Sequence, residues 1–242
     1  MFVRGEMSQT VPCYSDRICG PDETWSQIEA LLPRFGITRL SRLTGLDRVG
    51  IPVWNAVSPN ARSIVINQGK GIADIDAKVS AAMEALERAI AGEPLVPARR
   101  APRRDFATAG ETCLPLDIFI AAGQPVITED EPFDWLAGQD ILTGETVWVP
   151  RGAMLLDRTD PAPRFWQSSD GLASGNSEAE AILHGLLERI ERDADCLWRL
   201  LARERRLATA VDAAAFADPV VHSLTERFTT AGLDLRLFDI TS

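Results

Sequence analysis

The sequence is poor in the residues that build most metal and hydrolase sites. It has two histidines, His184 and His222, and four scattered cysteines, with no C-x-x-C pair. A structural zinc site needs Cys or His in close pairs, so this composition argues against one. The chain also lacks a Ser-His-Asp order and a G-x-S-x-G turn, which argues against a hydrolase triad. A reactive site here must therefore use Asp, Glu, Asn, Ser, Lys and Arg.

Positive charge and long apolar runs are scarce as well. Lys and Arg number 25 against 35 Asp and Glu, which gives a formal net charge of -10. Nonspecific nucleic-acid binding needs a basic surface, so nucleic acid is not an expected partner. No apolar run approaches the roughly 18 residues of a membrane span, and the N-terminal residues lack a signal-peptide core. We expect a cytoplasmic protein that does not enter the membrane.

Hydrophobic periodicity predicts an α/β mixed (α+β) fold with two long helices. The chain is 45% hydrophobic, enough for a globular core. Residues 76–91 are rich in Ala and carry an apolar stripe at helical spacing, and residues 177–206 form a longer helix with Ser177 as its N-cap. A shorter helix is expected at 21–34, and three strands are expected at 35–46, 51–57 and 63–67. Residues 93–112 are expected to form an exposed Pro- and Arg-rich loop or hinge.

An approximate internal repeat is the most informative feature of the chain. The helical segment 78–88 aligns with the segment 182–192, at an offset of 104 residues, and both end in E-x-x-E-R. A glycine-rich turn precedes each helix, and the same offset relates Gly71 to Gly175. We therefore expect a pseudo-repeat, with antiparallel-rich sheets covered by the long helices.

Each of these helices carries two carboxylates on one face. Glu84 and Glu87 are three residues apart, as are Glu188 and Glu191. When partly buried, two carboxylates about 4 Å apart repel by about 4 kcal/mol at an effective dielectric of about 20, and a cation removes that cost. Paired hard oxygens suit Mg²⁺, which takes one or two carboxylates plus substrate phosphates. Two such helices facing each other would hold metal ions against a polyphosphate.

A purely structural interpretation of these charges stays open. Glu84 precedes Arg88 by four positions and Glu188 precedes Arg192 by four, which is the orientation of a stabilising surface ion pair. Lys70 lies between two glycines, but G-K-G lacks the spacing of a P-loop, so an ordinary turn lysine is the simpler interpretation.

Asn176 and Glu180 lie one turn apart at the expected start of the second long helix. Backbone N–H groups at a helix start favour phosphate. Helix capping is the alternative role for both side chains.

Three segments together resemble the YcaO superfamily, the ATP- and Mg²⁺-dependent enzymes that activate peptide backbone amides. They are residues 36–60, 69–88 and 168–194, and the resemblance runs from about residue 12 to the end of the chain. Residues 12–70 are most similar to the YcaO proteins associated with TfuA partners, which are linked to thioamide formation.

The resemblance implies ATP and Mg²⁺ as cofactors and suggests roles residue by residue. Glu84, Glu87, Glu188 and Glu191 match the family's metal-ligating glutamates. Lys70 is included among the expected nucleotide-binding residues because it lies between two glycines. No side chain is assigned a catalytic role. The expected cofactor-binding residues are Arg17, Thr24, Lys70, Ser80, Arg88, Asn176, Glu180 and Arg192.

Two departures from the family pattern stand out. Asp170 occupies a position where the family often has Asn. Family members usually run well beyond this length, with a third nucleotide-binding segment, and the final alternating residues LDLRLFDITS predict a strand with no successor. We expect a single YcaO-like domain over 1–242 that lacks its C-terminal part.

The expected function is ATP- and Mg²⁺-dependent phosphorylation of a peptide backbone amide, leading to a thioamide or an azoline. One alternative is a non-catalytic scaffold or partner-binding YcaO fragment whose carboxylates are merely solvated. Another is an unrelated nucleotide-using ligase. The candidate partners are a peptide or protein substrate, a TfuA-like protein, and a second copy of the chain in a homodimer.

Overall fold

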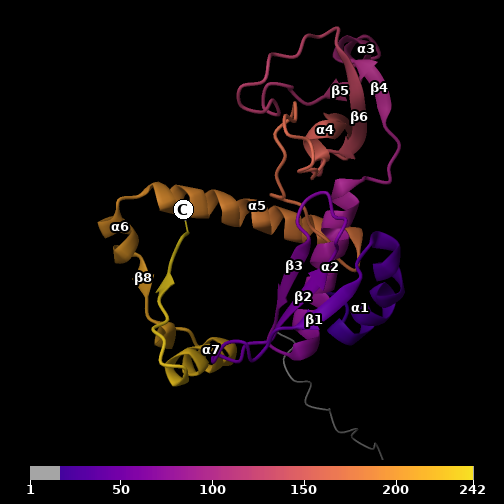
Figure 1. The fold of residues 1–242 in the computed structure, drawn as a ribbon. Coiled ribbons are helices and arrows are strands. Elements are labelled where there is room, and N and C mark those ends of the chain that lie inside the picture. The colour runs from indigo at the N-terminus through magenta and orange to yellow at the C-terminus, as the bar shows by residue number, and fades with distance from the viewer. Residues whose placement is uncertain (1–16, 242) are drawn as a thin grey trace, which may run out of the picture.

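The computed structural model describes residues 17–241 (Figure 1). As predicted, it is a mixed α/β fold in which long helices accompany antiparallel-rich sheets. Within the described residues, no helix combines the length and the apolar character that crossing a membrane would require.

The first sheet and its helices form the N-terminal layer. Its three strands are antiparallel, in the order β1-β2-β3. The elements of this layer are α1 (Pro21–Ile28), the 3₁₀ helix η1 (Glu29–Phe35), β1 (Arg39–Arg42), β2 (Val53–Val57), β3 (Ile66–Lys70) and α2 (Asp74–Gly92).

Helix α2 lies close against the first sheet because its inner face is made of alanine. Ala77, Ala81 and Ala82 are fully buried. A Cβ added at Gly69 of β3 would lie 2.1 Å from the Ala77 carbonyl oxygen, so the approach requires glycine there. Lys78 places its ammonium 3.5 Å from the centroid of the Trp25 ring, which fixes α1 against α2.

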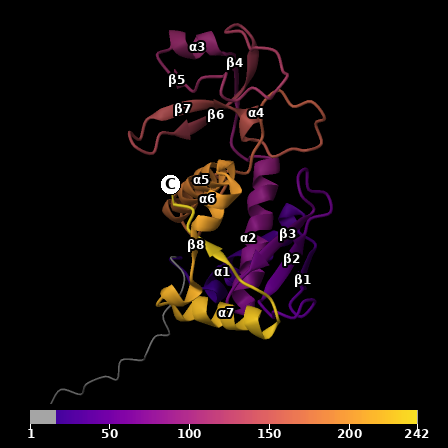
Figure 2. The same cartoon turned by 90° about the vertical axis from the view of Figure 1, so that its left-hand side faces the viewer.

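A second sheet has the order β4-β6-β7-β5, with β5 parallel to β7 and the other pairs antiparallel. Phe106 and Trp135 are fully buried in its separate core. Figures 1 and 2 show that α5 (Glu178–Leu200) lies between this sheet and α7 (Pro219–Thr230). Its elements are β4 (Arg99–Pro102), α3 (Arg103–Thr108), β5 (Thr112–Cys113), β6 (Pro132–Gln139), β7 (Thr146–Pro150) and α4 (Arg151–Met154).

The prediction of an exposed loop over 93–112 is wrong from residue 99 onward. That part of the segment contains β4, α3 and β5. The arginines that suggested a solvated loop are paired: Arg103 contacts Glu129 at 2.6 Å and Arg104 contacts Asp130 at 2.6 Å. Glu129 and Asp130 lie just before β6, each 26 residues after its arginine partner, so local sequence could not reveal these pairs.

The C-terminal part is built on one long helix. Ser177 caps it as predicted, since its Oγ accepts a hydrogen bond from the Glu180 amide at 3.2 Å. The predicted terminal strand pairs with β8. These elements are α5 (Glu178–Leu200), α6 (Arg203–Ala208), β8 (Ala210–Val211), η2 (Ala213–Ala215), α7 (Pro219–Thr230) and β9 (Leu237–Phe238).

The two glycine-rich turns make equivalent contacts with the helices that follow them. A Cβ on Gly71 would lie 2.6 Å from the amide nitrogen of Ala77, and one on Gly175 would lie 2.7 Å from that of Ala181. Each glycine thus faces the amide six residues further on. The internal repeat is therefore present in the structure as well as in the sequence, because both turns pack in the same way against the first turn of the helix that follows.

Candidate functional site

A pocket of about 680 Å³ forms where three distant parts of the chain meet. The segment entering α1, the first turns of α2 and the loop before α5 all contribute to its lining. The pocket brings together eight of the side chains that the sequence singled out: Arg17, Thr24, Lys70, Ser80, Glu84, Glu87, Asn176 and Glu180.

Glu180 organises one end of this pocket. Its side chain is only 2% exposed, and Arg17 donates to its Oε1 at 2.8 Å. The Ile18 amide donates to Oε2 at 3.2 Å, and the Asn176 Nδ2 lies 3.3 Å from Oε1. Burial by itself would raise the pKa of Glu180, but these donors outweigh it and hold the pKa below its usual value. Glu180 is therefore an anion that ties the N-terminal segment to α5.

Thr24 links α1 to the same loop. Its hydroxyl lies 2.9 Å from Asn176 Oδ1 and 3.2 Å from the Gly20 carbonyl oxygen. Asn176 and Glu180 do not cap α5, because Ser177 does. The capping interpretation of these two residues is therefore wrong, and their side chains bridge segments far apart in the sequence.

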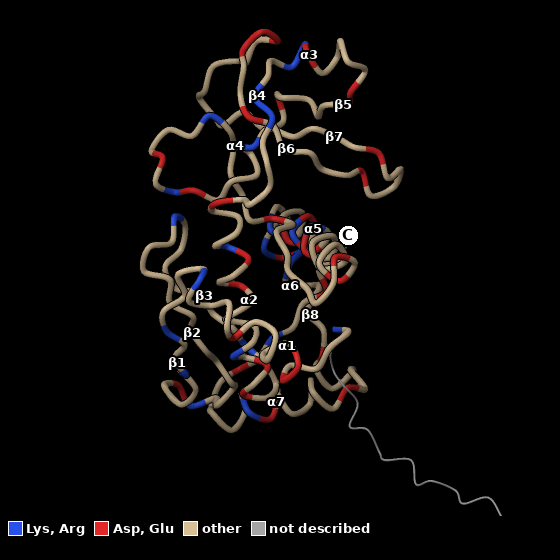
Figure 3. Tube along the Cα trace, turned by 90° about the vertical axis from the view of Figure 1, so that its right-hand side faces the viewer, with Lys and Arg blue, Asp and Glu red and all other residues tan. Residues whose placement is uncertain are grey.

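The opposite end of the pocket carries the α2 carboxylates. Burial raises the pKa of Glu87 to about 7, with Glu84 and Glu188 adding to the rise and Arg88 and Ser174 opposing it. Figure 3 shows acidic positions on α2 and α5 where the two helices approach. Glu87 is thus a partly desolvated carboxyl group with acidic neighbours, which a cation would favour in its charged form.

The expected surface ion pair on α2 is also present. Arg88 donates through Nε to Glu84 Oε1 at 3.1 Å, and its side chain is only 17% exposed. Arg88 does not line this pocket. The contact that the structure gives Arg88 is the ion pair that holds the Glu84 side chain in place.

The second carboxylate pair is arranged differently. Glu188 accepts a hydrogen bond from the Gly171 amide at 2.9 Å, and Arg192 contacts it at 3.3 Å. Arg192 also lies 3.7 Å from Asp170. Glu191 is exposed. In the described structure Glu188, Glu191 and Arg192 therefore do not join the pocket lining.

The donor set can be tested against Mg²⁺ on chemical grounds. No group of three or more His, Cys, Asp or Glu side chains within residues 17–241 is gathered as a metal cage. Mg²⁺ rarely uses such cages, because it binds through one or two carboxylates together with substrate phosphates and water. Glu84 and Glu87 supply two hard-oxygen ligands beside a large pocket, so they fit an ion that arrives with a polyphosphate.

Sequence reasoning missed some residues of this pocket. Ser174 lines it and lowers the pKa of Glu87 through its side chain. Ser174 stands 104 residues after Lys70, so the repeat offset could have found it. Asp76 also lines the pocket, and its carboxylate accepts from the Ala73 amide at 2.9 Å at the start of α2.

Comparison with known families gives one clear match. A family model described as "YcaO cyclodehydratase, ATP- and Mg²⁺-binding" matches residues 68–242. A Rhizobium leguminosarum bv. trifolii protein, named as uncharacterized in the tfuA 3' region, is 42% identical over 97% of this chain and 56% of its own length. An uncharacterized protein of Methanothermobacter thermautotrophicus is 35% identical over 92% of this chain and 57% of its own. The chain therefore spans about half the length of these relatives.

Solved structures share the fold. YcaO from Methanopyrus kandleri, bound with AMPPCP and Mg²⁺, has a TM-score of 0.63 and 27% identity over 87% of this chain and 52% of its own. A heterocyclase in complex with substrate and cofactor has a TM-score of 0.76 over 95% of this chain and 34% of its own. The heterocyclase is 23% identical, so its likeness supports the fold alone.

Proposed function

The chain belongs to the YcaO cyclodehydratase family, and from this premise we propose that the protein uses ATP and Mg²⁺ to activate a peptide backbone amide. The observation that carries the proposal is the single pocket in which Arg17, Thr24, Asn176 and Glu180 meet Glu84 and Glu87. At about 680 Å³ it lies within the usual range of ligand sites. The Methanopyrus kandleri relative, bound with a nucleotide analogue and Mg²⁺, supports the same assignment.

The nucleotide would bind between the N-terminal segment and the loop before α5. Thr24 and Asn176 offer hydroxyl and amide groups for the polar parts of the nucleoside, and Arg17 and Lys70 offer positive charge. The pocket also reaches Gly71 at the entry to α2, where backbone N–H groups favour phosphate. Arg88 would keep Glu84 oriented toward the pocket.

Glu84 and Glu87 would hold Mg²⁺, and bound Mg²⁺ would neutralise charge on the transferring phosphoryl group. Glu188 lies near enough to Glu87 to raise its pKa, so it is the next candidate ligand. Glu191 and Arg192 stay predictions drawn from the family resemblance. The protein's part is to position the reactants and to screen charge, which needs no protein nucleophile.

The proposed reaction has two steps. The amide oxygen attacks the γ-phosphorus of ATP, the bond to the bridging oxygen breaks, and ADP leaves. A nucleophile then adds to the amide carbon, and the former amide oxygen leaves within inorganic phosphate. Sulfide gives a thioamide with loss of its proton, whereas a neighbouring Cys, Ser or Thr side chain gives an azoline with loss of its own proton and that of the amide nitrogen.

We favour the thioamide product, with a TfuA-like partner. The support is the Rhizobium relative, whose name places it in a tfuA 3' region and which is 42% identical over 97% of this chain. The azoline product is the alternative outcome of the same experiment.

Cells that carry the intact gene, a deletion, or the double variant Glu84→Gln/Glu87→Gln provide the test. We expect peptides with an oxygen-to-sulfur exchange to appear by mass spectrometry only with the intact gene. The control Glu145→Gln/Glu226→Gln removes the same charge from exposed positions and should retain the product. Loss of water in place of sulfur exchange would identify the azoline reaction. No mass change in any peptide would contradict amide activation and favour the scaffold alternative.

A further inference from the structure

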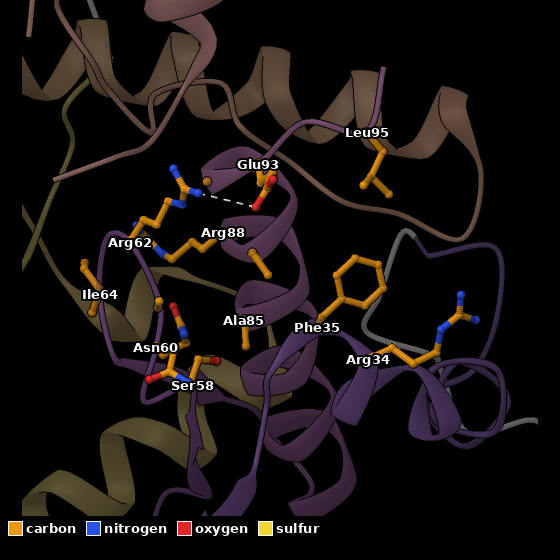
Figure 4. Close-up of a pocket in the computed structure, with 14 residues that line it drawn as sticks. Arg34, Phe35, Ser58, Asn60, Arg62, Ile64, Ala85, Arg88, Glu93 and Leu95 are labelled. Atoms are coloured by element: carbon orange, nitrogen blue, oxygen red, sulfur yellow. Dashed lines mark ion pairs between the residues drawn. The ribbon is translucent and has the colours of Figure 1, made fainter. Parts of the chain in front are cut away.

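A second cavity, of about 300 Å³, lies on the neighbouring flank of α2, and the proposed reaction does not use it (Figure 4). It is enclosed by the end of η1, the connection between β2 and β3, strand β3 itself, and the C-terminal half of α2. It is separate from the first pocket, because the two linings share no residue.

Two buried polar atoms at this cavity, one on Ser58 and one on Asn67, have no hydrogen-bond partner among the described residues. Ser58 is 4% exposed and Asn67 is 2% exposed, and both line the cavity. Ser58 Oγ and Asn67 Oδ1 make no hydrogen bond within the described part of the chain. Buried polar atoms are nearly always bonded in native proteins, so this pair points to a bound group. Asn67 Oδ1 can only accept, so that group must carry an N–H or O–H donor.

The guanidinium groups of Arg62 and Arg88 line the end of the cavity where Ser58 lies. Arg88 uses Nε for Glu84, which engages one of its five N–H donors. Arg62 contacts Asp157 at 3.1 Å and Glu93 at 3.6 Å, and Figure 4 shows it on the same side of the cavity as Ser58. Arginine forks match the planar geometry of carboxylates, so this end suits such an anion.

The other side of the cavity carries apolar side chains beside Arg34. Figure 4 shows Phe35 and Leu95 across from Arg62 and Ser58, with Ala85 between them. Leu95 is 76% exposed, so this side is open to a ligand. A ligand that combines a carboxylate, an N–H donor and an aliphatic or aromatic part would therefore match these lining residues.

We propose that this cavity binds a carboxylate-bearing, N-acylated amino-acid residue of the peptide substrate. The identification with the substrate rests on the proposed function, whereas the binding itself does not. Glu84 lines the first pocket and Arg88 lines the second, so their ion pair connects the two.

The carboxylate could belong to a peptide C-terminus or to an acidic side chain. Three probes distinguish these sources in calorimetric titrations of the 242-residue chain without nucleotide. N-acetyl-leucine carries a terminal carboxylate, N-acetyl-glutamic acid α-amide carries one on its side chain, and N-acetyl-leucinamide carries none. We expect one or both of the acids to bind and the leucinamide to bind at least tenfold more weakly.

Some variants should weaken binding of the acid and another should strengthen it, which makes the test more specific. Arg62→Gln and Ser58→Ala should each weaken binding of the acid about fivefold or more, as expected for loss of one hydrogen bond. Glu93→Gln removes a carboxylate that competes for Arg62 and should strengthen binding. The control Arg100→Gln, on an exposed side chain of the second sheet, should change nothing.

Binding of all three probes with equal affinity, or of none, would overturn the proposal, the latter meaning that water alone fills the cavity. Because no ATP is present, failure of Mg-ATP to bind the first pocket would leave this result standing. Failure of the acids to bind would likewise leave the proposed nucleotide site standing, because nucleotide binding in the first pocket does not use the second cavity.

Discussion

Burial raises the pKa of Glu87 to about 7, and the carboxylates of Glu84 and Glu188 add to the rise. A raised carboxyl pKa means that the folded chain holds a proton which the unfolded chain releases. This term therefore lowers folding stability as pH rises from about 4, where unfolded glutamate titrates, to about 7. Above that pH the destabilisation is complete.

Glu87→Gln should therefore stabilise the metal-free chain at alkaline pH. In EDTA and without nucleotide, we expect its free energy of unfolding at about pH 8 to exceed that of the wild type by on the order of 1–2 kcal/mol, a figure reduced for solvent screening. At about pH 4 the two should be equal. Urea titrations at both pH values measure this, and equal stability at pH 8 would contradict the burial of a charged Glu87.

Glu180 should show the opposite pH dependence. Burial would raise its pKa, but the donors from Arg17, Ile18 and Asn176 together lower it, so its contribution to stability is present near neutral pH and is lost as pH falls through the lowered folded pKa. We expect Glu180→Gln to lower the free energy of unfolding by about 1–3 kcal/mol at pH 7. The difference from wild type should narrow toward pH 3 in the same urea assay. A constant difference would mean that the ion pair with Arg17 is not its source.

At the residue scale, the internal repeat points to the carboxylates of the pocket but not to which of the two pairs lines it. Glu84 and Glu87 stand out because a matching pair follows 104 residues later, and the structure places both in the pocket. Asp170 shows the limit. Its contacts with Arg189 at 3.3 Å and Arg192 at 3.7 Å turn Arg192 toward a loop, and no local pattern announces such a pairing.

At the element scale, the entry to each long helix depends on a glycine. A methyl group on Gly71 would lie 2.4 Å from Asp76 Cβ, and one on Gly175 would lie 2.7 Å from the Ala181 amide nitrogen. Because helix backbone cannot yield easily, each contact would displace the first turn of a helix that lines the pocket.

We therefore expect Gly71→Ala and Gly175→Ala each to cost about 1–3 kcal/mol of stability and to weaken Mg-ATP binding. Gly138→Ala in β6 is the matched control, since its added Cβ would meet only the Val147 oxygen at 3.4 Å. Thermal unfolding and nucleotide titration of the three variants give the comparison. Equal behaviour of Gly71→Ala and Gly138→Ala would show that the turn tolerates a side chain.

Element boundaries were predictable where one physical rule dominates. The apolar stripe of 76–91 corresponds to α2. The expected helix 177–206 is interrupted after Leu200, and α6 resumes at Arg203. The residues between them are ordinary helix formers, so tertiary context decides where the helix stops.

At the scale of the whole molecule, two separate cores support different parts of the chain. The core of the first sheet contains α1 and α2 residues, and that of the second sheet centres on Phe106 and Trp135. The candidate site is assembled on the first core, not on the second. Whether these cores act as one domain, as the sequence predicts, stays a prediction.

Trp135→Ala probes this division. We expect it to reduce the stability of the second sheet by about 3–5 kcal/mol, because a fully buried indole and its bond to the Ala101 oxygen are lost. Mg-ATP affinity should persist at temperatures where the variant stays folded. Ala81→Leu, which overpacks the first core against Gly69, should instead weaken binding. Circular dichroism with nucleotide titration measures both, and loss of binding in Trp135→Ala would show that the cores are coupled.

Calorimetric titration of Mg-ATP tests the central claim most directly. The 242-residue chain would be compared with Glu84→Ala/Glu87→Ala and with the charge-matched control Glu145→Ala/Glu226→Ala. We predict binding that requires Mg²⁺, disappears in the first double variant and persists in the control. A well-folded chain that binds no Mg-ATP, or binds it equally in both double variants, would contradict the assignment of this pocket.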